Sequence, residues 1–471
     1  MAANIFTGAT NSNWNTSTNW SLGAVPTGSD GNTATFDATS PNCTVNVSAV
    51  CNSIDFTGYT NTITMTNQIQ SNGNITLDSG MLISGSGALV CAETATLTSD
   101  GKTWPNALTL QGTSKTRTLA DDWTVTGLVN LAGATTNVLN GNNLYCQDSL
   151  TQANQIISGT TTIHLIGTGT WSVSGTTSLR NNLVFNTAGT ITVSGTVTHN
   201  TGTITYVAGT IVTTGSTLTR NAVDAGDLDT AGMTWNNITI GTSNSTLTLL
   251  SDVNMTGTLS TGTATQTTFT GAFNMNVGGG LSIGTTGLWV GTASIVLNGT
   301  GSIVFGGSAP EIRINVTINT SGTITFNTSN PIHINTGTFT YVTGTVVTTG
   351  STLAISNSAT LNLNGLILDN LTLGNSAASA KTWTLNSGFV INGAFVCTGP
   401  TALNNSTLKS SSVGVQRVVT LAQGGTHQIN FLVVEDIDSS QGVTIWNWRG
   451  TLSNASNWKS LVPPSTAAFA S

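Results

Sequence analysis

Residues that could perform acid–base chemistry are scarce in this chain, which has only eighteen Asp and Glu among 471 residues. Enzymes of the parallel β-helix type that cleave polysaccharides need paired carboxylates, or carboxylates with basic residues, on one face of a sheet. Three groups could supply them: Asp121 with Asp122; Asp224, Asp227 and Asp229; and Glu435, Asp436 and Asp438.

None of these groups has the pattern of an acid–base pair. Asp121 and Asp122 are adjacent, so a strand would point their side chains to opposite faces. The second group lies in a glycine-containing loop (NAVDAGDLDT), which suits a calcium ion better, because Ca²⁺ takes several oxygen ligands from one flexible segment. The third follows an apolar strand and marks its exposed end. We therefore expect a non-enzyme with no catalytic or cofactor-binding residue, and calcium is the one ion left open.

Cysteine and histidine do not suggest a metal site. The five cysteines, which neither pair evenly nor cluster at metal-ligand spacings, are Cys43, Cys51, Cys91, Cys146 and Cys397. Cys43 and Cys51 could face each other across a short turn, but buried free thiols that behave as small apolar residues are the expected state. The four histidines are scattered, and there is no CxxC motif.

Internal repetition organises the chain. Residues 203–218 (TITYVAGTIVTTGSTL) return almost unchanged as residues 338–353 (TFTYVTGTVVTTGSTL). Related phrases open at Trp104 (WPNALTL), Trp235 (WNNITI) and Leu368 (LDNLTL). The separation between the copies, from residue 203 to residue 338, exceeds the length of one solenoid repeat. Each repeat should therefore hold several smaller turns of chain.

The amino-acid sequence within each repeat predicts short strands. Every second residue is apolar or β-branched in runs such as residues 190–193 (TITV), 203–207 (TITYV), 210–213 (TIVT) and 217–219 (TLT). Gly, Asn and Ser-Gly separate the runs and favour turns. No helical stripe with caps is present. The fold class is therefore predicted to be all-β.

Low charge narrows the architecture to a β-solenoid, or parallel β-helix rod. Charged residues make up 6% of the chain, where about 25% is usual. Strands of successive coils stack about 4.8 Å apart, so like charges would lie over one another, whereas Thr and Asn ladders form hydrogen bonds. A coil of about 20 residues would give about 20 coils. Disorder is disfavoured because 38% of the residues are hydrophobic.

Tryptophans mark both ends. The same pattern, Asn-Trp, then Asn-Trp, then a nearby Pro, occurs in residues 13–26 (NWNTSTNWSLGAVP) and in residues 447–463 (NWRGTLSNASNWKSLVP). Open solenoid ends expose strand edges, so these segments should act as caps. A second interpretation is a surface on which sugar rings stack. Its candidate residues are Trp14, Trp20, Trp446, Trp448 and Trp458.

The predicted organisation has six parts. Residues 1–70 form an N-terminal cap with the first coils, and residues 71–103 form further coils. Repeat units follow at 104–234, at 235–367 and, incomplete, at 368–440. Residues 441–471 form a C-terminal cap or docking segment. Interruptions near 221–232 and 413–428 are the loops in which we expect recognition.

The N-terminal segment also resembles a family. Its pattern runs through Trp14, Asn19, Trp20, Ser21, Gly23, Val25, Pro26 and Asp30 to a turn with Cys51, Ser53, Ile54, Phe56, Thr57, Gly58 and Tyr59. This pattern resembles uncharacterised β-solenoid structural proteins of tailed phages, of the tail-fibre or virion-appendage type, and is also similar to bacterial β-solenoid surface adhesins. The resemblance is close over about the first 70 residues and otherwise one of composition. It implies a virion or surface fibre and no reaction.

Partners and location follow as expectations. The start (MAANIFTGATNSNW) has no basic and apolar leader, which favours a virion part assembled in a host cytoplasm over a secreted adhesin at the cell surface. The expected partners are other virion proteins, a host-surface glycan and further copies of the chain, a trimer included. Nucleic acid is not expected, because eleven dispersed basic residues stand against a net charge of −7. Membrane insertion is not expected either, because no stretch approaches eighteen apolar residues.

Overall fold

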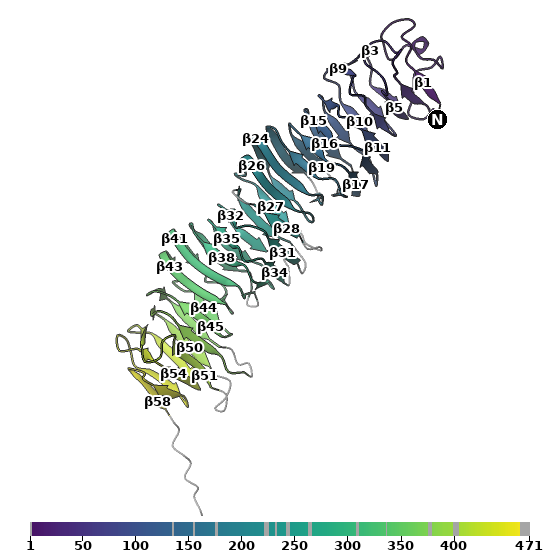
Figure 1. Cartoon of the computed structure of the whole chain (residues 1–471). Coiled ribbons are helices and arrows are strands. Elements are labelled where there is room, and N and C mark those ends of the chain that lie inside the picture. Colours follow the sequence, from purple (N-terminus) through teal and green to yellow (C-terminus); the bar gives the residue numbers. More distant parts are fainter. Residues whose placement is uncertain are drawn as a thin grey trace, which may run out of the picture. The chain divides into compact units, whose positions relative to one another are not determined.

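The computed structural model describes residues 2–133, 136–153, 156–174, 178–220, 226–230, 233–241, 245–261, 266–307, 310–335, 337–374, 379–398 and 405–461. The chain is all-β, with parallel strands stacked as a β-solenoid of about 18 turns (Figure 1). The predicted fold class is thus confirmed. In the described residues the one helical segment is a three-residue 3-10 turn, η1 (Ser17–Asn19), and no helix could cross a membrane.

The chain divides into two compact units. Unit 1 comprises Met1–Arg220 and Gly226–Thr234, and unit 2 comprises Asn221–Ala225 and Trp235–Ser471. The main break falls at Trp235, where the second repeat was predicted to begin. The six predicted parts and their boundaries stay predictions.

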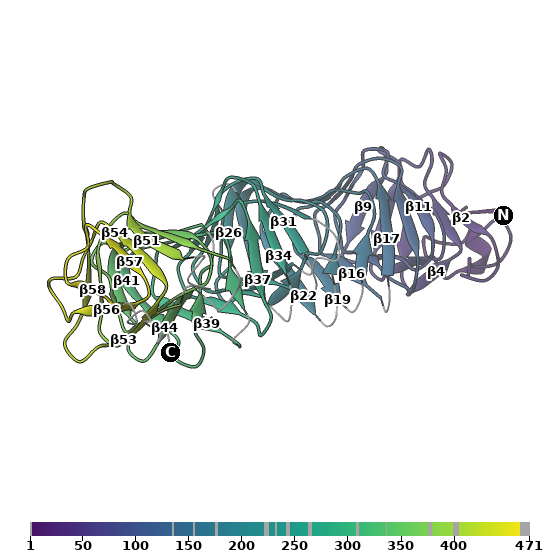
Figure 2. The ribbon, with the colours of Figure 1, turned by 90° about the horizontal axis from the view of Figure 1, so that it is seen from below.

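Turns in the middle of unit 1 contain three strands each. One turn is built from β14 (Thr116–Leu119), β15 (Trp123–Val125) and β16 (Val129–Ala132), and the next from β17 (Thr136–Gly141), β18 (Leu144–Cys146) and β19 (Leu150–Ala153). Each strand pairs in parallel with its counterpart one turn later, so that the strands lie side by side (Figure 2). The coil length predicted from stacking is therefore correct.

One sheet shows how far this stacking extends. Within the described part of unit 1, nine strands follow one another in it: β1 (Ala3–Ile5), β2 (Thr33–Thr35), β5 (Ser53–Asp55), β8 (Ile75–Thr76), β11 (Ala95–Thr98), β14, β17, β20 (Ile156–Ser158) and β23 (Ser178–Leu179).

Inward side chains form apolar columns. Leu108, in β13 (Leu108–Leu110), pairs with Val129, Val129 pairs with Leu150, and Leu150 pairs with Trp171 in β22 (Gly169–Ser174); all four side chains are buried. Burial of a large apolar side chain contributes about 1.5–3 kcal/mol. The period-two alternation in the sequence therefore places one apolar residue per strand position into a continuous core.

Outward polar residues form the predicted ladders. Thr151 donates a hydrogen bond to the Asn130 Oδ1 at 3.1 Å, and the Asn276 amide donates to the Asn254 Oδ1 at 2.8 Å. Hydroxyl groups of Thr239 and Ser260 lie 2.8 Å apart. In contrast, only two ion pairs, Lys115–Glu93 and Arg313–Glu311, occur among the described residues. Neutral ladders thus replace surface charges.

The N-terminal segment covers the first turn with aromatic rings. Trp14 and Trp20 are buried, with ring centroids 4.9 Å apart, and both pack against Phe36. The Trp20 indole N–H donates to the Trp14 carbonyl at 2.8 Å. Phe36 stacks on Phe56 of the next turn at 4.9 Å. The aromatic cluster closes the end of the apolar core.

A pair of long strands recurs in each unit. In unit 1, β24 (Leu183–Ser194) pairs with β26 (Ile204–Val212); in unit 2, β41 (Asn315–Phe326) pairs with β43 (Thr338–Val347). We predicted separate strands at 203–207 and 210–213, which is wrong. The intervening Gly209 adopts φ +114° inside β26 and makes an irregularity within one strand rather than a turn between two.

Candidate glycan-binding surface

Strand β56 (Ile445–Trp448) positions two tryptophans on the outside of unit 2. Ile445 and Asn447 are buried and Trp446 and Trp448 are exposed, as period-two alternation requires. The buried Asn447 amide donates to the Leu432 carbonyl at 2.7 Å and so fastens the strand to the core. Because residues two apart lie on one face, roughly 7 Å apart, both indoles face solvent from the same surface.

Two neighbouring strands frame the tryptophans. Strand β53 (Thr426–Asn430) lies on one side and β58 (Trp458–Leu461) on the other, both parallel to β56. Trp446 is in register with Lys459, whose Nζ lies 5.0 Å from the Trp446 ring centroid, and Trp448 is in register with Leu461. We define the indole surface as Trp446, Trp448, Lys459 and Leu461.

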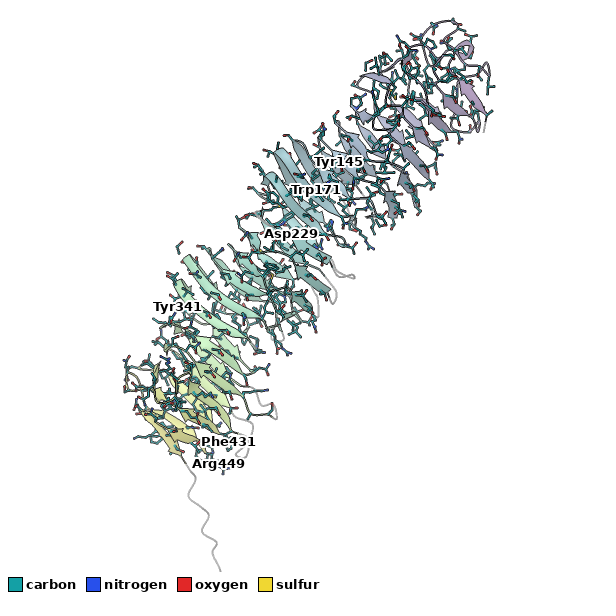
Figure 3. All side chains as sticks on the ribbon, viewed as in Figure 1. Tyr145, Trp171, Asp229, Tyr341, Phe431 and Arg449 are labelled. Carbon is teal, nitrogen blue, oxygen red and sulfur yellow. The ribbon has the colours of Figure 1, made fainter. Side chains whose placement is uncertain are left out.

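The backbone around this surface is strained. Phe431, after β53, and Arg449, after β56, have φ of 52° and 55°, a conformation that bulky residues rarely adopt. Figure 3 labels both near the end of unit 2. The Phe431 N–H donates to the Trp448 carbonyl at 2.8 Å, and the Arg449 N–H donates to the Leu461 carbonyl at 2.9 Å. Strain of about 1–3 kcal/mol per residue persists where surrounding structure enforces it, and such residues gather at functional sites.

A histidine in the neighbouring strand β53 holds β56 through a hydrogen bond. The Trp446 backbone N–H donates to the His427 Nε2 at 2.9 Å, so this nitrogen must be unprotonated. Partial burial lowers the pKa of His427, in agreement with a neutral ring. His427 therefore helps to hold Trp446 in place at neutral pH.

This surface has the chemistry of a sugar-binding platform. Indole faces are apolar and flat, and they stack on other flat faces with the exclusion of water. The ammonium group of Lys459 can donate hydrogen bonds to hydroxyl or carboxylate oxygens. Of the predicted tryptophans, Trp446 and Trp448 are 40% and 43% exposed.

The other three predicted tryptophans do not belong to this surface. Trp14, Trp20 and Trp458 are buried, so their faces are not available to a ligand. Trp14 and Trp20 lie in the aromatic cluster of unit 1, and Trp458 packs edge-on against Phe395 in unit 2, with ring centroids 6.4 Å apart. As sugar-stacking candidates these three residues are wrong, because strand alternation and end packing turn them inward.

Asp121 and Asp122 hold two different turns. Asp121 accepts hydrogen bonds from the backbone N–H groups of Ser99 (2.8 Å) and Asp100 (2.7 Å) in the preceding turn. Asp122 accepts from the N–H of Asn143 (2.9 Å) in the following turn. The two carboxylates thus point away from each other, as their adjacency in sequence predicted. Each one connects its own turn to a neighbouring turn by hydrogen bonds.

Aspartates at equivalent positions do the same work in the preceding turns. Asp78 accepts from the Gly58 N–H at 2.7 Å, and Asp100 accepts from the Ser79 N–H at 3.0 Å. These hydrogen bonds to Ser79 lower the pKa of Asp100. A general acid needs a raised pKa, so Asp100 is suited to holding backbone rather than to proton transfer, and the other carboxylates of this column make the same kind of backbone contact.

Two residues of the third acidic group, Asp436 and Asp438, also accept structural hydrogen bonds. Asp436 accepts hydrogen bonds from the Asn454 side chain and from the Gly414 N–H, and these lower the pKa of its carboxyl group. Asp438 accepts from the Ser440 N–H at 2.8 Å. The segment 413–428, where we expected a recognition loop, is not one loop, because β52 (Arg417–Leu421) and the start of β53 lie within it; Val413, before β52, is fully exposed.

The predicted calcium loop is described only in part. Asp224 lies outside the described residues, while Asp227 and Asp229 belong to β28 (Gly226–Asp229), where Figure 3 labels Asp229. In the described part of the chain, no three His, Cys, Asp or Glu side chains are grouped as metal ligands. The calcium interpretation stays a prediction.

The cysteines are all buried and unpaired. Burial raises the pKa of Cys51 and of Cys146 to about 12 each, so these thiols stay protonated and serve as small core residues. Cys51 and Cys91 both pair with Ser71 in one inward column. The expected role of the cysteines as apolar packing groups agrees with this placement.

Sequence reasoning missed Lys459, Leu461 and His427 as neighbours of the tryptophans. Only the strand register brings them together, and no residue pattern signals it. It also missed Tyr145, which Figure 3 labels, and His164, whose rings stack at 4.6 Å on adjacent strands of unit 1.

Comparison with known proteins gives no relative. No family model matches the chain, and neither a curated protein nor a solved structure matches it.

Proposed function

We propose that this chain is a non-enzymatic structural protein of a phage particle, a fibre or a capsid or tail appendage that attaches to a host-surface glycan through its indole surface. The observation that carries the glycan part is the exposure of Trp446 and Trp448 on one face of β56, framed by Lys459. Aromatic side chains that lie side by side on the exposed face of a sheet do not pack in the core, and they lower the solubility of the protein.

The scaffold suits such a role. A solenoid built from backbone hydrogen bonds and neutral ladders presents a fixed surface with little conformational entropy to lose on binding. Several copies on one particle would gain strength by avidity, because each further contact becomes intramolecular. Other virion proteins and further copies of the chain, a trimer included, are the partners that this proposal implies.

The virion assignment rests on the resemblance of the N-terminal segment to phage β-solenoid proteins. The same resemblance extends to bacterial adhesins, so a cell-surface or extracellular-matrix protein of this architecture is the alternative. A polysaccharide-cleaving enzyme is a weaker alternative, since four of the candidate carboxylates, those of Asp121, Asp122, Asp436 and Asp438, accept hydrogen bonds from backbone N–H groups.

Immunogold electron microscopy of the source material tests the location. Antibody against this chain should place gold on phage capsids or tails and leave cell envelopes unlabelled. Label on an envelope or in a matrix would overturn the virion proposal and support the adhesin. Release of reducing sugars from host polysaccharide by the purified chain would contradict the non-enzymatic assignment.

A further inference from the structure

The two long strand pairs leave an open edge in each unit. In unit 2, β43 pairs with β45 (Ala359–Asn362) only at residues 338–340. In unit 1, the described part of the next turn pairs with β26 only at Ile204 and Thr205. The remaining residues, 206–212 and 341–347, form the segments that we call the first and second open edge.

A tight turn in the following coil creates the second open edge. After β45 the chain reverses within four residues, with Asn364 and Gly365 at φ 45° and 77° and the Leu366 N–H donating to the Leu363 carbonyl at 2.7 Å. The coils meet again where the Thr348 hydroxyl donates to the Ile367 carbonyl at 3.1 Å. Four residues therefore pass beside seven, and the next coil does not pair with residues 341–347.

Equivalent contacts build the two edges. The Tyr206 hydroxyl donates to the Gly209 carbonyl at 2.8 Å, and the Tyr341 hydroxyl donates to the Gly344 carbonyl at 2.7 Å (Figure 3 labels Tyr341). Gly344 has φ +118°, close to the +114° of Gly209.

The strand beneath each edge is fastened in the same way. Thr187 donates to the Gly167 carbonyl, and Thr320 donates to the Gly299 carbonyl. The closest repetition in the sequence, residues 203–218 and 338–353, is thus a repeated open edge.

The edges also expose matching apolar side chains. Val207 and Val342 are 57% and 49% exposed, and Val212 and Val347 are 37% and 39% exposed. Core packing does not account for these valines, which recur at equivalent positions of both repeats.

Both open edges lack the sequence features that usually protect the edge of a sheet from pairing with another strand. Natural sheets protect edges with charges, proline or coverage by other segments. Neither repeated block contains a charged residue or a proline. One acceptor of each edge is closed by the tyrosine, and in unit 2 the Asn364 amide also donates to the Tyr341 carbonyl at 2.8 Å. Apart from the Gly344 carbonyl, which Tyr341 closes, the described next coil leaves the stretch from Val342 to Val347 without a paired strand.

We infer that each open edge pairs with the corresponding edge of a second copy of this chain, backbone to backbone, with the valines covered in the interface. An open edge selects an extended, uncharged strand, because a charged partner would lose hydration against valine and threonine without gaining an ion pair. The chain itself carries two such strands, in a protein that is otherwise net negative by seven charges. The same strand can pair with itself about a twofold axis.

Lysine substitutions test this pairing without disturbing the fold, since the valines are exposed. Val207→Lys, Val342→Lys and the double variant are compared with the parent chain by sedimentation velocity over a concentration series. Leu82→Lys, at a side chain equally exposed at 57% but outside both edges, is the matched control. Thermal unfolding of each variant verifies the fold.

The parent chain and Leu82→Lys should associate alike. Each single variant should raise the dissociation constant by about tenfold or more, and the double variant should be monomeric. Amide hydrogen exchange at 207–212 and 342–347 should slow as the parent concentration rises. This test is independent of glycan binding and of location.

Three outcomes would overturn the inference. They are a parent chain that stays monomeric, a double variant of unchanged mass, and equal dissociation by Leu82→Lys. Protection of the edges only after addition of another particle protein would likewise overturn self-pairing and assign the edges to a foreign strand.

Discussion

The Lys459 ammonium group lies 5.0 Å from the centroid of the Trp446 ring, across two adjacent parallel strands at the end of unit 2. An exposed cation over an indole ring contributes about 0.5–1 kcal/mol. Trp446→Ala, Lys459→Met and the double variant therefore form a mutant cycle. We expect a coupling free energy of about that size from urea unfolding; strictly additive effects would show that the ring and the ammonium group do not interact.

Buried His199 should make unit 1 sensitive to acid. Burial, with the Arg220 guanidinium beside it, holds the pKa of His199 well below its usual value of 6.5. As the pH falls below 6.5 the unfolded chain binds a proton that the folded chain does not, so stability is lost, by up to about 1.4 kcal/mol per pH unit.

His199→Gln removes this titration while an amide keeps one donor and one acceptor for Asn181 and Arg220. Urea unfolding between pH 7 and pH 5 should show a smaller loss of stability for the variant than for the parent chain. An unchanged pH dependence would assign the acid sensitivity to other groups.

The two buried N-terminal tryptophans should differ in what they lose on conversion to phenylalanine. The Trp20 indole N–H donates to the Trp14 carbonyl, whereas the Trp14 N–H has no partner among the described residues. Trp20→Phe should therefore cost about 0.5–1.5 kcal/mol more unfolding free energy than Trp14→Phe. Equal losses in urea unfolding would contradict the hydrogen bond.

Gly344 and Gly424 separate steric from conformational demands. Both have positive φ, but a Cβ on Gly344 would come within 2.6 Å of the Thr320 Cγ2, while a Cβ on Gly424 would meet nothing within 4 Å. Gly344→Ala should cost at least about 1 kcal/mol more than Gly424→Ala. If the two alanine variants unfold at the same urea concentration, the close approach of β43 to β41 is not as described.

The fold was predictable because its causes are local. Alternation of period two, glycine between runs and scarcity of charge each act over a few residues, and together they specify stacked strands. Where a local signal was ambiguous, prediction failed: Gly209 looked like a turn but lies inside β26, because the pairing with β24 outweighs the tendency of glycine to end a strand.

The candidate site was predictable only in part. The phrase Trp446-Asn447-Trp448 correctly suggests two indoles on one face, but nothing local distinguishes it from Trp458, which faces inward. The proximity of Lys459 and His427 depends on the register of three strands. The open edges were also hidden, since they depend on the length of the next coil.

Glycan binding by the indole surface is tested most directly by a glycan array followed by calorimetry on the best ligand. The parent chain and Leu82→Ala should bind equally, while the Trp446→Ala/Trp448→Ala double variant, folded because both side chains are exposed, should lose at least about 2 kcal/mol of binding free energy, roughly thirtyfold in Kd. Undiminished binding by the double variant, or no binding of any glycan by the parent chain, would contradict the proposal.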